Sequence, residues 1–140
     1  MAEETTAHLL AGRARLRKST TVLLVGNIEL TMAWYKGLGF EARYFPPGFC
    51  ILRRDDVEVF LQHYDGNVRP DDPGAHERGA WNVYMETDDV LSLFNEVSRR
   101  PEIQVIRAPS PQPYGQIEFE VIDLNGYVLV FAQPIQATFY

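Results

Sequence analysis

Hydrophobic residues change their period along the first half of the chain, and each change marks a new element. The run STTVLLV at residues 19–25 is rich in β-branched side chains, which predicts a buried strand. Apolar residues then recur every three or four positions, as on one face of a helix, and Asn27 precedes them as a candidate cap. Three short extended runs follow, broken by proline, glycine and aspartate, at residues 40–45, 49–54 and 57–64. The first half therefore has the predicted order β-α-β-β-β.

The same order of elements returns after a polar stretch at residues 65–79. Its hydrophobic residues follow neither a helical nor a strand period. A strand is predicted over residues 80–87, and Asp88 is a candidate cap for a helix over residues 89–100. Three further strands are predicted, with a turn before the last one, over residues 103–108, 116–123 and 127–133. The pattern thus predicts an α+β fold built from two βαβββ modules.

These modules define the predicted domain organisation of the 140-residue chain. Residues 1–18 form an N-terminal basic arm, residues 19–134 form a single domain, and residues 135–140 form a C-terminal tail. Within the domain the modules span residues 19–64 and 80–134, and the polar stretch between them is a linker loop. A module of about 60 residues buries too little surface to be stable alone. We therefore expect the two modules to pack side by side or to exchange with those of a second chain.

Charge is distributed unevenly along the chain. The net charge is −6, but the basic arm holds four basic and two acidic residues, which leaves the remainder at −8. An acidic surface repels phosphate backbones, so the composition argues against a nucleic-acid partner. The same surface attracts a small cationic ligand.

The sequence contains no sign of a membrane segment. No apolar run approaches the roughly 20 residues of a membrane-spanning helix, and the N-terminus lacks the order of a secretory signal. We therefore expect a cytoplasmic protein without a membrane partner. The single cysteine, Cys50, cannot form a disulfide within the chain and is predicted to be a small buried hydrophobe.

Four segments resemble the vicinal oxygen chelate superfamily, which includes glyoxalase I, extradiol dioxygenases, and the fosfomycin- and bleomycin-resistance proteins. The resemblance is strongest to the bleomycin-resistance branch and covers residues 20–134. It rests on LLVGNIELTMAWYKGLGFEARY at the first helix, ILRRDDVEVFLQ at the middle hairpin, AWNVYMETDDVLSLF at the start of the second module and PYGQIEFEVIDLNGYVLVFAQ at the end. Two positions depart from the usual pattern, since Leu124 replaces a proline and Ile117 replaces an arginine. The resemblance implies a homodimer with concave ligand cups.

Members of this superfamily that use a metal take one ligand from the first strand and one from the last strand of each module. None of the four matching positions here holds a normal ligand for a divalent ion. They are Thr20, Phe60, Asn82 and Val130. Among the histidines, His8 lies in the arm and His76 in the linker loop, while His63 should point to the face opposite Phe60. We therefore expect no metal and no other cofactor.

Strand alternation predicts which side chains line the cups. If Phe60 and Asn82 mark the concave side, the remaining lining is aromatic and acidic. The predicted ligand-binding residues are Phe60, Glu58, Gln62, Asn82, Tyr84, Glu86, Tyr44, Phe49, Tyr114 and Val130. Rings and carboxylates together suit a flat, cationic, partly aromatic molecule. The alternative is that the rings only pack and the glutamates are solvated. Trp34 and Trp81 are predicted to be core residues.

The sequence supports three functional interpretations. The first is a metal-independent protein that binds a small organic, antibiotic-like cation without turnover, as the resemblance to drug-sequestering bleomycin-resistance proteins implies. The second is a metal-independent lyase or isomerase, with candidate general bases at Glu58, Glu86, Glu118 and Glu120. No paired nucleophile and base accompanies them, so we assign no catalytic residue and favour a protein that is not an enzyme. The third is a protein-interaction module that uses the basic arm.

Overall fold

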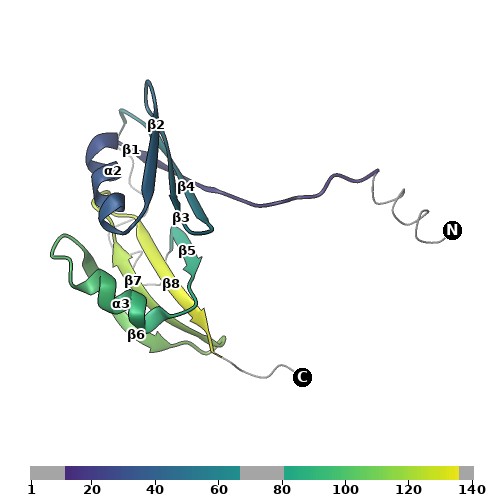
Figure 1. Cartoon of the computed structure of the whole chain (residues 1–140), viewed down its shortest axis with the longest axis vertical. Coiled ribbons are helices and arrows are strands. Elements are labelled where there is room, and N and C mark those ends of the chain that lie inside the picture. Colours follow the sequence, from purple (N-terminus) through teal and green to yellow (C-terminus); the bar gives the residue numbers. More distant parts are fainter. Residues whose placement is uncertain (1–11, 67–80, 136–140) are drawn as a thin grey trace.

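The computed structural model describes residues 12–66 and 81–135, which fold into two βαβββ modules (Figure 1). The first module contains β1 (Thr21–Val25), α2 (Ile28–Gly37), β2 (Glu41–Phe45), β3 (Phe49–Arg54) and β4 (Val57–His63). The second contains β5 (Val83–Glu86), α3 (Val90–Ser98), β6 (Gln104–Pro111), β7 (Gln116–Ile122) and β8 (Val128–Pro134). The predicted α+β fold is therefore confirmed.

The two modules have the same strand pairing. The first sheet has the order β1-β4-β3-β2, and the second has the order β5-β8-β7-β6. In each sheet the first strand of the module pairs in parallel with the last, and the other pairs are antiparallel. A parallel pair needs a crossover connection, to which α2 and α3 contribute. Both helices lie on the same side of the molecule, each over one face of its own sheet (Figure 1).

Both helices begin at polar caps. The side chain of Asn27 accepts a hydrogen bond from the backbone nitrogen of Leu30 at 2.9 Å, which confirms the predicted cap of α2. The cap of α3 is Asp89, whose carboxylate accepts from the backbone nitrogen of Ser92 at 3.0 Å. The prediction of Asp88 was therefore wrong by one residue. Two adjacent aspartates offer two candidate caps, and the residue at which the helix begins decides between them.

Strand β5 is shorter than predicted, and this changes the position of a tryptophan. It covers Val83–Glu86 instead of residues 80–87, so Trp81 lies before the strand and strand alternation does not apply to it. Trp81 is 41% exposed, and its predicted place in the core was wrong. Trp34 is buried, as predicted, and its Nε1 donates to the backbone oxygen of Glu102 at 3.2 Å.

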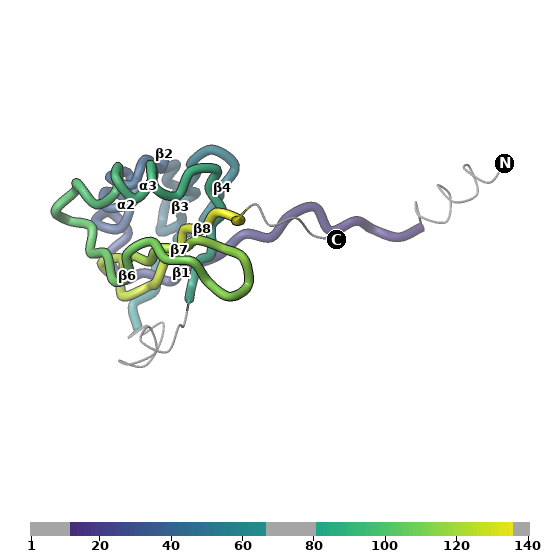
Figure 2. The backbone as a smooth tube through the Cα atoms, turned by 90° about the horizontal axis from the view of Figure 1, so that it is seen from below, coloured from purple at the N-terminus to yellow at the C-terminus, as the bar shows by residue number. Residues whose placement is uncertain are grey.

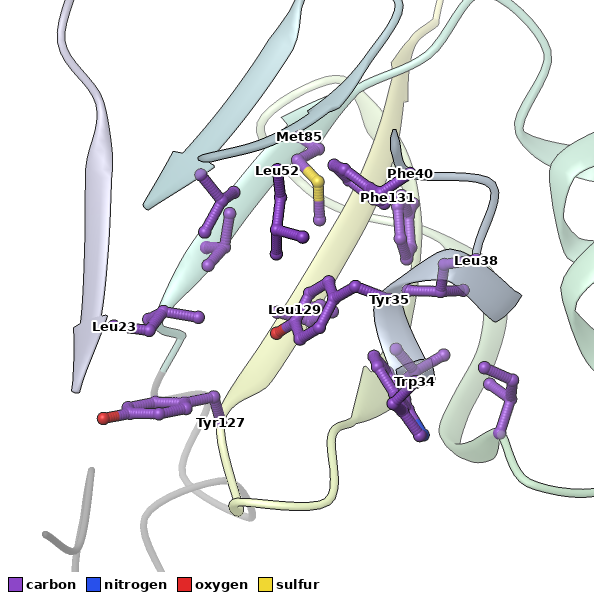
Figure 3. Close-up of a cluster of buried hydrophobic side chains, with 14 of the residues drawn as sticks. Leu23, Trp34, Tyr35, Leu38, Phe40, Leu52, Met85, Tyr127, Leu129 and Phe131 are labelled. Carbon is purple, nitrogen blue, oxygen red and sulfur yellow. The ribbon is translucent and has the colours of Figure 1, made fainter. Parts of the chain in front are cut away.

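One continuous hydrophobic core lies between the helices and the sheets (Figure 3). Side chains alternate along each strand, so every second residue points toward this core. Residues of both modules build it, including Leu23, Tyr35, Leu52, Leu61, Phe119, Leu129 and Phe131. Cys50 is completely buried here, which confirms its prediction as a small buried hydrophobe. Neither described helix covers the opposite face of either sheet, and we call these two surfaces the open faces.

Side-chain hydrogen bonds fasten the first module to the second. The hydroxyl of Tyr35 on α2 donates to the buried carboxylate of Asp123, which follows β7, at 2.6 Å. The guanidinium of Arg54 on β3 donates to both oxygens of Glu96 on α3, at 2.9 and 3.1 Å. The two modules of one chain therefore pack side by side, which is one of the two arrangements expected from their size.

The described part of the basic arm extends away from the body of the molecule (Figures 1 and 2). Its side chains are exposed from residue 12 to residue 19, and Leu16 is completely exposed. Near the end of the arm, Nζ of Lys18 lies 2.9 Å from Oε1 of Glu58 on β4. His8 and His76 lie outside the described residues.

Replacing Tyr35 with phenylalanine should lower the free energy of unfolding by about 1–3 kcal/mol, because the buried carboxylate of Asp123 loses a hydrogen-bond donor. The phenylalanine ring keeps the packing, so the loss reports mainly the hydrogen bond. Urea unfolding measures this change in the free energy of unfolding. Tyr44→Phe is the control, since the hydroxyl of Tyr44 donates to the backbone oxygen of Pro47 at the surface. Equal stability of Tyr35→Phe and the wild type would contradict this role.

Candidate ligand-binding site

The open face of the first sheet is mainly aromatic. Glu58, Phe60 and Gln62 lie on it, because they alternate along β4 with residues that are buried in the core. The ring centroid of Phe49 on β3 lies 5.1 Å from that of Phe60 and 6.1 Å from that of Phe45 on β2. The three rings form a continuous row, and Phe45 belongs to it although the sequence analysis did not select this residue.

The structure does not bring Tyr44 together with the other predicted residues. Tyr44 pairs with Cys50 across β2 and β3, and Cys50 is buried in the core. Directly paired residues of neighbouring strands point to the same face, so Tyr44 lies on the helix side of the sheet. The sequence placed Tyr44 only near a strand end, and the pairing register of β2 was needed to assign its face.

The carboxylate of Glu58 is already paired with two cations. Nη2 of Arg53 lies 2.5 Å from its Oε2, and Nζ of Lys18 lies 2.9 Å from its Oε1. The hydrogen bonds from Arg53 and Lys18 lower the pKa of Glu58 to about 2. The negative charge of this side chain is therefore compensated within the chain.

The open face of the second sheet carries a buried carboxylate between two tyrosines. The hydroxyls of Tyr84 on β5 and Tyr114 before β7 donate to Glu118 at 2.5 and 2.6 Å. Glu118 is only 3% exposed. Desolvation and the hydrogen bond to Glu118 raise the pKa of Tyr84, and they raise the pKa of Tyr114 to about 12. Both phenols therefore stay protonated at neutral pH and keep donating to the carboxylate.

Trp81 extends this group of side chains toward solvent. Its ring centroid lies 5.3 Å from that of Tyr84 and 6.5 Å from that of Tyr114. All three rings are between 41% and 52% exposed, so a molecule in solution can reach them. We call Trp81, Tyr84, Tyr114 and Glu118 the Glu118 cluster.

Two of the four positions matched to metal ligands, Asn82 and Val130, have structural roles. The side-chain oxygen of Asn82 accepts a hydrogen bond from the backbone nitrogen of Val128 at 2.8 Å, and Val130 is completely buried. His63 is partly exposed at the end of β4, with its Nε2 at 3.2 Å from Oδ1 of Asp65. Among the described residues, no three His, Cys, Asp or Glu side chains lie close enough to hold one metal ion.

Glu86 lies on the open face of the second sheet, because it follows Tyr84 by two residues along β5, and it also borders a second opening. It lies at the end of β5, where it lines a cleft of about 320 Å³ between the two modules. Met85, Leu93 and Phe131 give this cleft apolar walls, and the turn between β3 and β4 forms part of its rim. Glu86 is also a neighbour of the Glu118 cluster, since Glu86 and Glu118 both pair with Ala132 on β8 and the charge of Glu86 contributes to the raised pKa of Tyr84.

The sequence analysis selected Glu58 and Glu86 for the cups and treated Glu118 only as a candidate base. A signal for Glu118 was present, since apolar and acidic residues alternate along QIEFEVI in β7 and place Glu118 and Glu120 on one face. A glutamate on an alternating strand is normally solvated. Only the packing of two tyrosines over Glu118 reveals that it is buried.

The two modules and their strand order define the fold of the glyoxalase, bleomycin-resistance and dioxygenase proteins, which is the fold of the vicinal oxygen chelate superfamily. A bleomycin resistance determinant encoded on transposon Tn5 matches with a TM-score of 0.65 and 22% identity, over 85% of this chain and 98% of that one. The bleomycin-binding protein complexed with bleomycin matches with a TM-score of 0.65 and 20% identity, over 84% and 98%. A glyoxalase/bleomycin resistance protein/dioxygenase from Nocardioides matches with a TM-score of 0.64 and 12% identity, over 96% of this chain and 95% of that one.

The likeness rests on structure and establishes the fold that the sequence motifs predicted. The sequence matches no protein-family model and no curated protein. None of the helices in the described part of the chain is long and apolar enough to cross a membrane.

The Glu58 carboxylate should titrate with a pKa of about 2, below its ordinary value of 4.5. Because the folded-state pKa is the lower one, the ion pairs stabilise the fold above about pH 4.5, and this contribution is lost as the pH falls toward 2. NMR titration of the side-chain carboxyl carbon measures the pKa. Arg53→Gln should raise it, because the hydrogen bond from Arg53 is the largest cause of the shift. An unchanged pKa in that variant would disprove the pairing.

Proposed function

We propose that this protein binds a small, partly aromatic, cationic molecule on its open faces, without a metal and without turnover. The observation that carries the proposal is the buried carboxylate of Glu118, for which no ion pair is found among the described residues. Its hydrogen bonds come from neutral phenols, so a ligand cation would add a charge partner that the described residues do not provide. The exposed rings of Trp81, Tyr84 and Tyr114 around it add a surface that attracts cations.

A homodimer would complete the binding site. Each open face is one wall, and the two walls differ in chemistry. The first carries the row of Phe45, Phe49 and Phe60, and the second carries the Glu118 cluster. If the first open face of one copy opposes the second open face of its partner, a ligand lies between apolar rings and a negative wall. The fold likeness to a bleomycin-binding protein complexed with bleomycin supports a small-molecule ligand.

The arrangement of the carboxylates favours binding over turnover. A general base must be able to take a proton near neutral pH. Glu58 is held in two ion pairs that lower its pKa to about 2, which makes it a weak base. Both oxygens of Glu118 accept hydrogen bonds from phenols, so neither is directed at a substrate. These contacts support a binding protein in preference to a lyase or isomerase.

Native mass spectrometry combined with a calorimetric titration of bleomycin tests this proposal. We expect a metal-free dimer that binds bleomycin at a fixed stoichiometry and releases it with unchanged mass. A stoichiometric divalent ion in the dimer would contradict metal-free binding. A changed bleomycin mass would contradict binding without turnover, and absence of binding would remove the antibiotic-like ligand class.

Replacing Tyr84 with alanine should weaken bleomycin binding by about 2 kcal/mol, because it removes a ring and a hydroxyl from the proposed site. The ring is 43% exposed, so the free energy of unfolding should fall by less than the binding free energy. Tyr44→Ala is a matched control, since Tyr44 is 40% exposed but lies on the helix side of its sheet. A large loss of stability with unchanged affinity would make Tyr84 a structural residue instead.

A further inference from the structure

The carboxylate of Glu118 lies beneath two hydroxyl groups and is not itself exposed. We propose that Tyr84 and Tyr114 present the negative charge of Glu118 to a ligand through their hydroxyl oxygens, and that the ligand group bound there is an amidinium or guanidinium. This inference rests on the proposed function and deepens it. It assigns the chemical class of the cation and the residues that recognise it.

The glutamates of the open faces differ in their partners. Glu58 on the first open face is paired with Arg53 and Lys18. Glu120, the other buried glutamate of β7, has Nε of Arg107 at 3.6 Å. In the described part of the chain, Glu118 has hydrogen bonds from neutral phenols but no cation within ion-pair distance. A cationic ligand therefore gains most at this position.

The two tyrosines bring this charge to the surface. Tyr84 donates to Oε2 of Glu118 and Tyr114 donates to Oε1, so each phenol engages a different carboxylate oxygen. A hydroxyl that donates its hydrogen keeps lone pairs for accepting, and a carboxylate partner polarises it and strengthens that acceptor. Glu118 is 3% exposed, whereas Tyr84 and Tyr114 are 43% and 52% exposed. A ligand can therefore meet the negative potential without displacing the phenols.

The arrangement fits a planar cation with several N–H groups. The two hydroxyl oxygens provide two acceptors on either side of one carboxylate, and an amidinium or guanidinium can offer a separate N–H group to each of them. The neighbouring ring of Trp81 provides a face on which a flat cation can stack. A divalent metal ion fits poorly, since both oxygens of Glu118 already accept hydrogen bonds from phenols and no group of three His, Cys, Asp or Glu side chains among the described residues could hold one.

Benzamidine and benzamide form a matched pair of probes, because they share a planar aromatic shape and differ in charge. Titrations followed by amide NMR should show the wild-type protein binding benzamidine at least tenfold more tightly than benzamide. The perturbed amides should lie on β5 and β7. Glu118→Gln should abolish the preference for benzamidine, and Tyr114→Phe should reduce benzamidine affinity about threefold or more while leaving benzamide unchanged. Glu29→Gln removes an exposed carboxylate from α2, on the opposite side of the first sheet from its open face, and should change neither affinity.

With the two probes, three outcomes would overturn the inference. They are equal binding of both probes to the wild type, an unchanged preference in Glu118→Gln, and loss of the preference in Glu58→Gln instead. The map of perturbed amides in the wild type locates the site independently, so a Glu118→Gln variant that failed to fold would still leave a decisive result. Benzamidine preference in a protein that does not retain bleomycin would remove the antibiotic-like ligand class and leave this inference standing. Bleomycin binding unaffected by Glu118→Gln would refute this inference alone.

Discussion

The hydrogen bond between Tyr35 and Asp123 joins the two modules, and the position of both open faces depends on it. The carboxylate that accepts from Tyr35 at 2.6 Å also accepts from the backbone nitrogens of Asn125 and Tyr127, at 2.8 and 2.9 Å. One buried side chain therefore closes the turn between β7 and β8 and fixes α2 against it. Because both helices pack into the shared core, the opposite faces of the sheets are left for other contacts.

The two open faces carry different chemistry although their backbones are alike. On the first, Glu58 is compensated by Arg53 and Lys18, and a row of phenylalanines lies beside apolar residues such as Val22 and Ile51. On the second, the carboxylate of Glu118 accepts hydrogen bonds from two phenols and has no cation within ion-pair distance in the described residues. A repeated fold thus presents an apolar wall and a negative wall, which together suit a molecule with an aromatic part and a cationic part.

Local features of the sequence predicted most elements of the fold, and the exceptions have physical causes. Strand β3 begins and ends at the predicted residues, since a turn bounds it on each side. Strand β5 was predicted too long, which placed Trp81 in the core instead of on the surface. Tyr44 was assigned to the cup without knowledge of its pairing with Cys50. Among the candidate site residues, Phe60 and Tyr84 lie on open faces as strand alternation indicated.

The sequence by itself determined the two βαβββ modules, because hydrophobic period, caps and turn residues act between positions close in the chain. It also determined that the four matched positions lack normal metal ligands. Only the tertiary structure decided which glutamate is paired with cations and which is buried beneath phenols. Lys18 reaches Glu58 from 40 residues away, and Tyr84 reaches Glu118 from 34 residues away. Burial and ion pairing depend on such distant contacts, and no local pattern of residues encodes them.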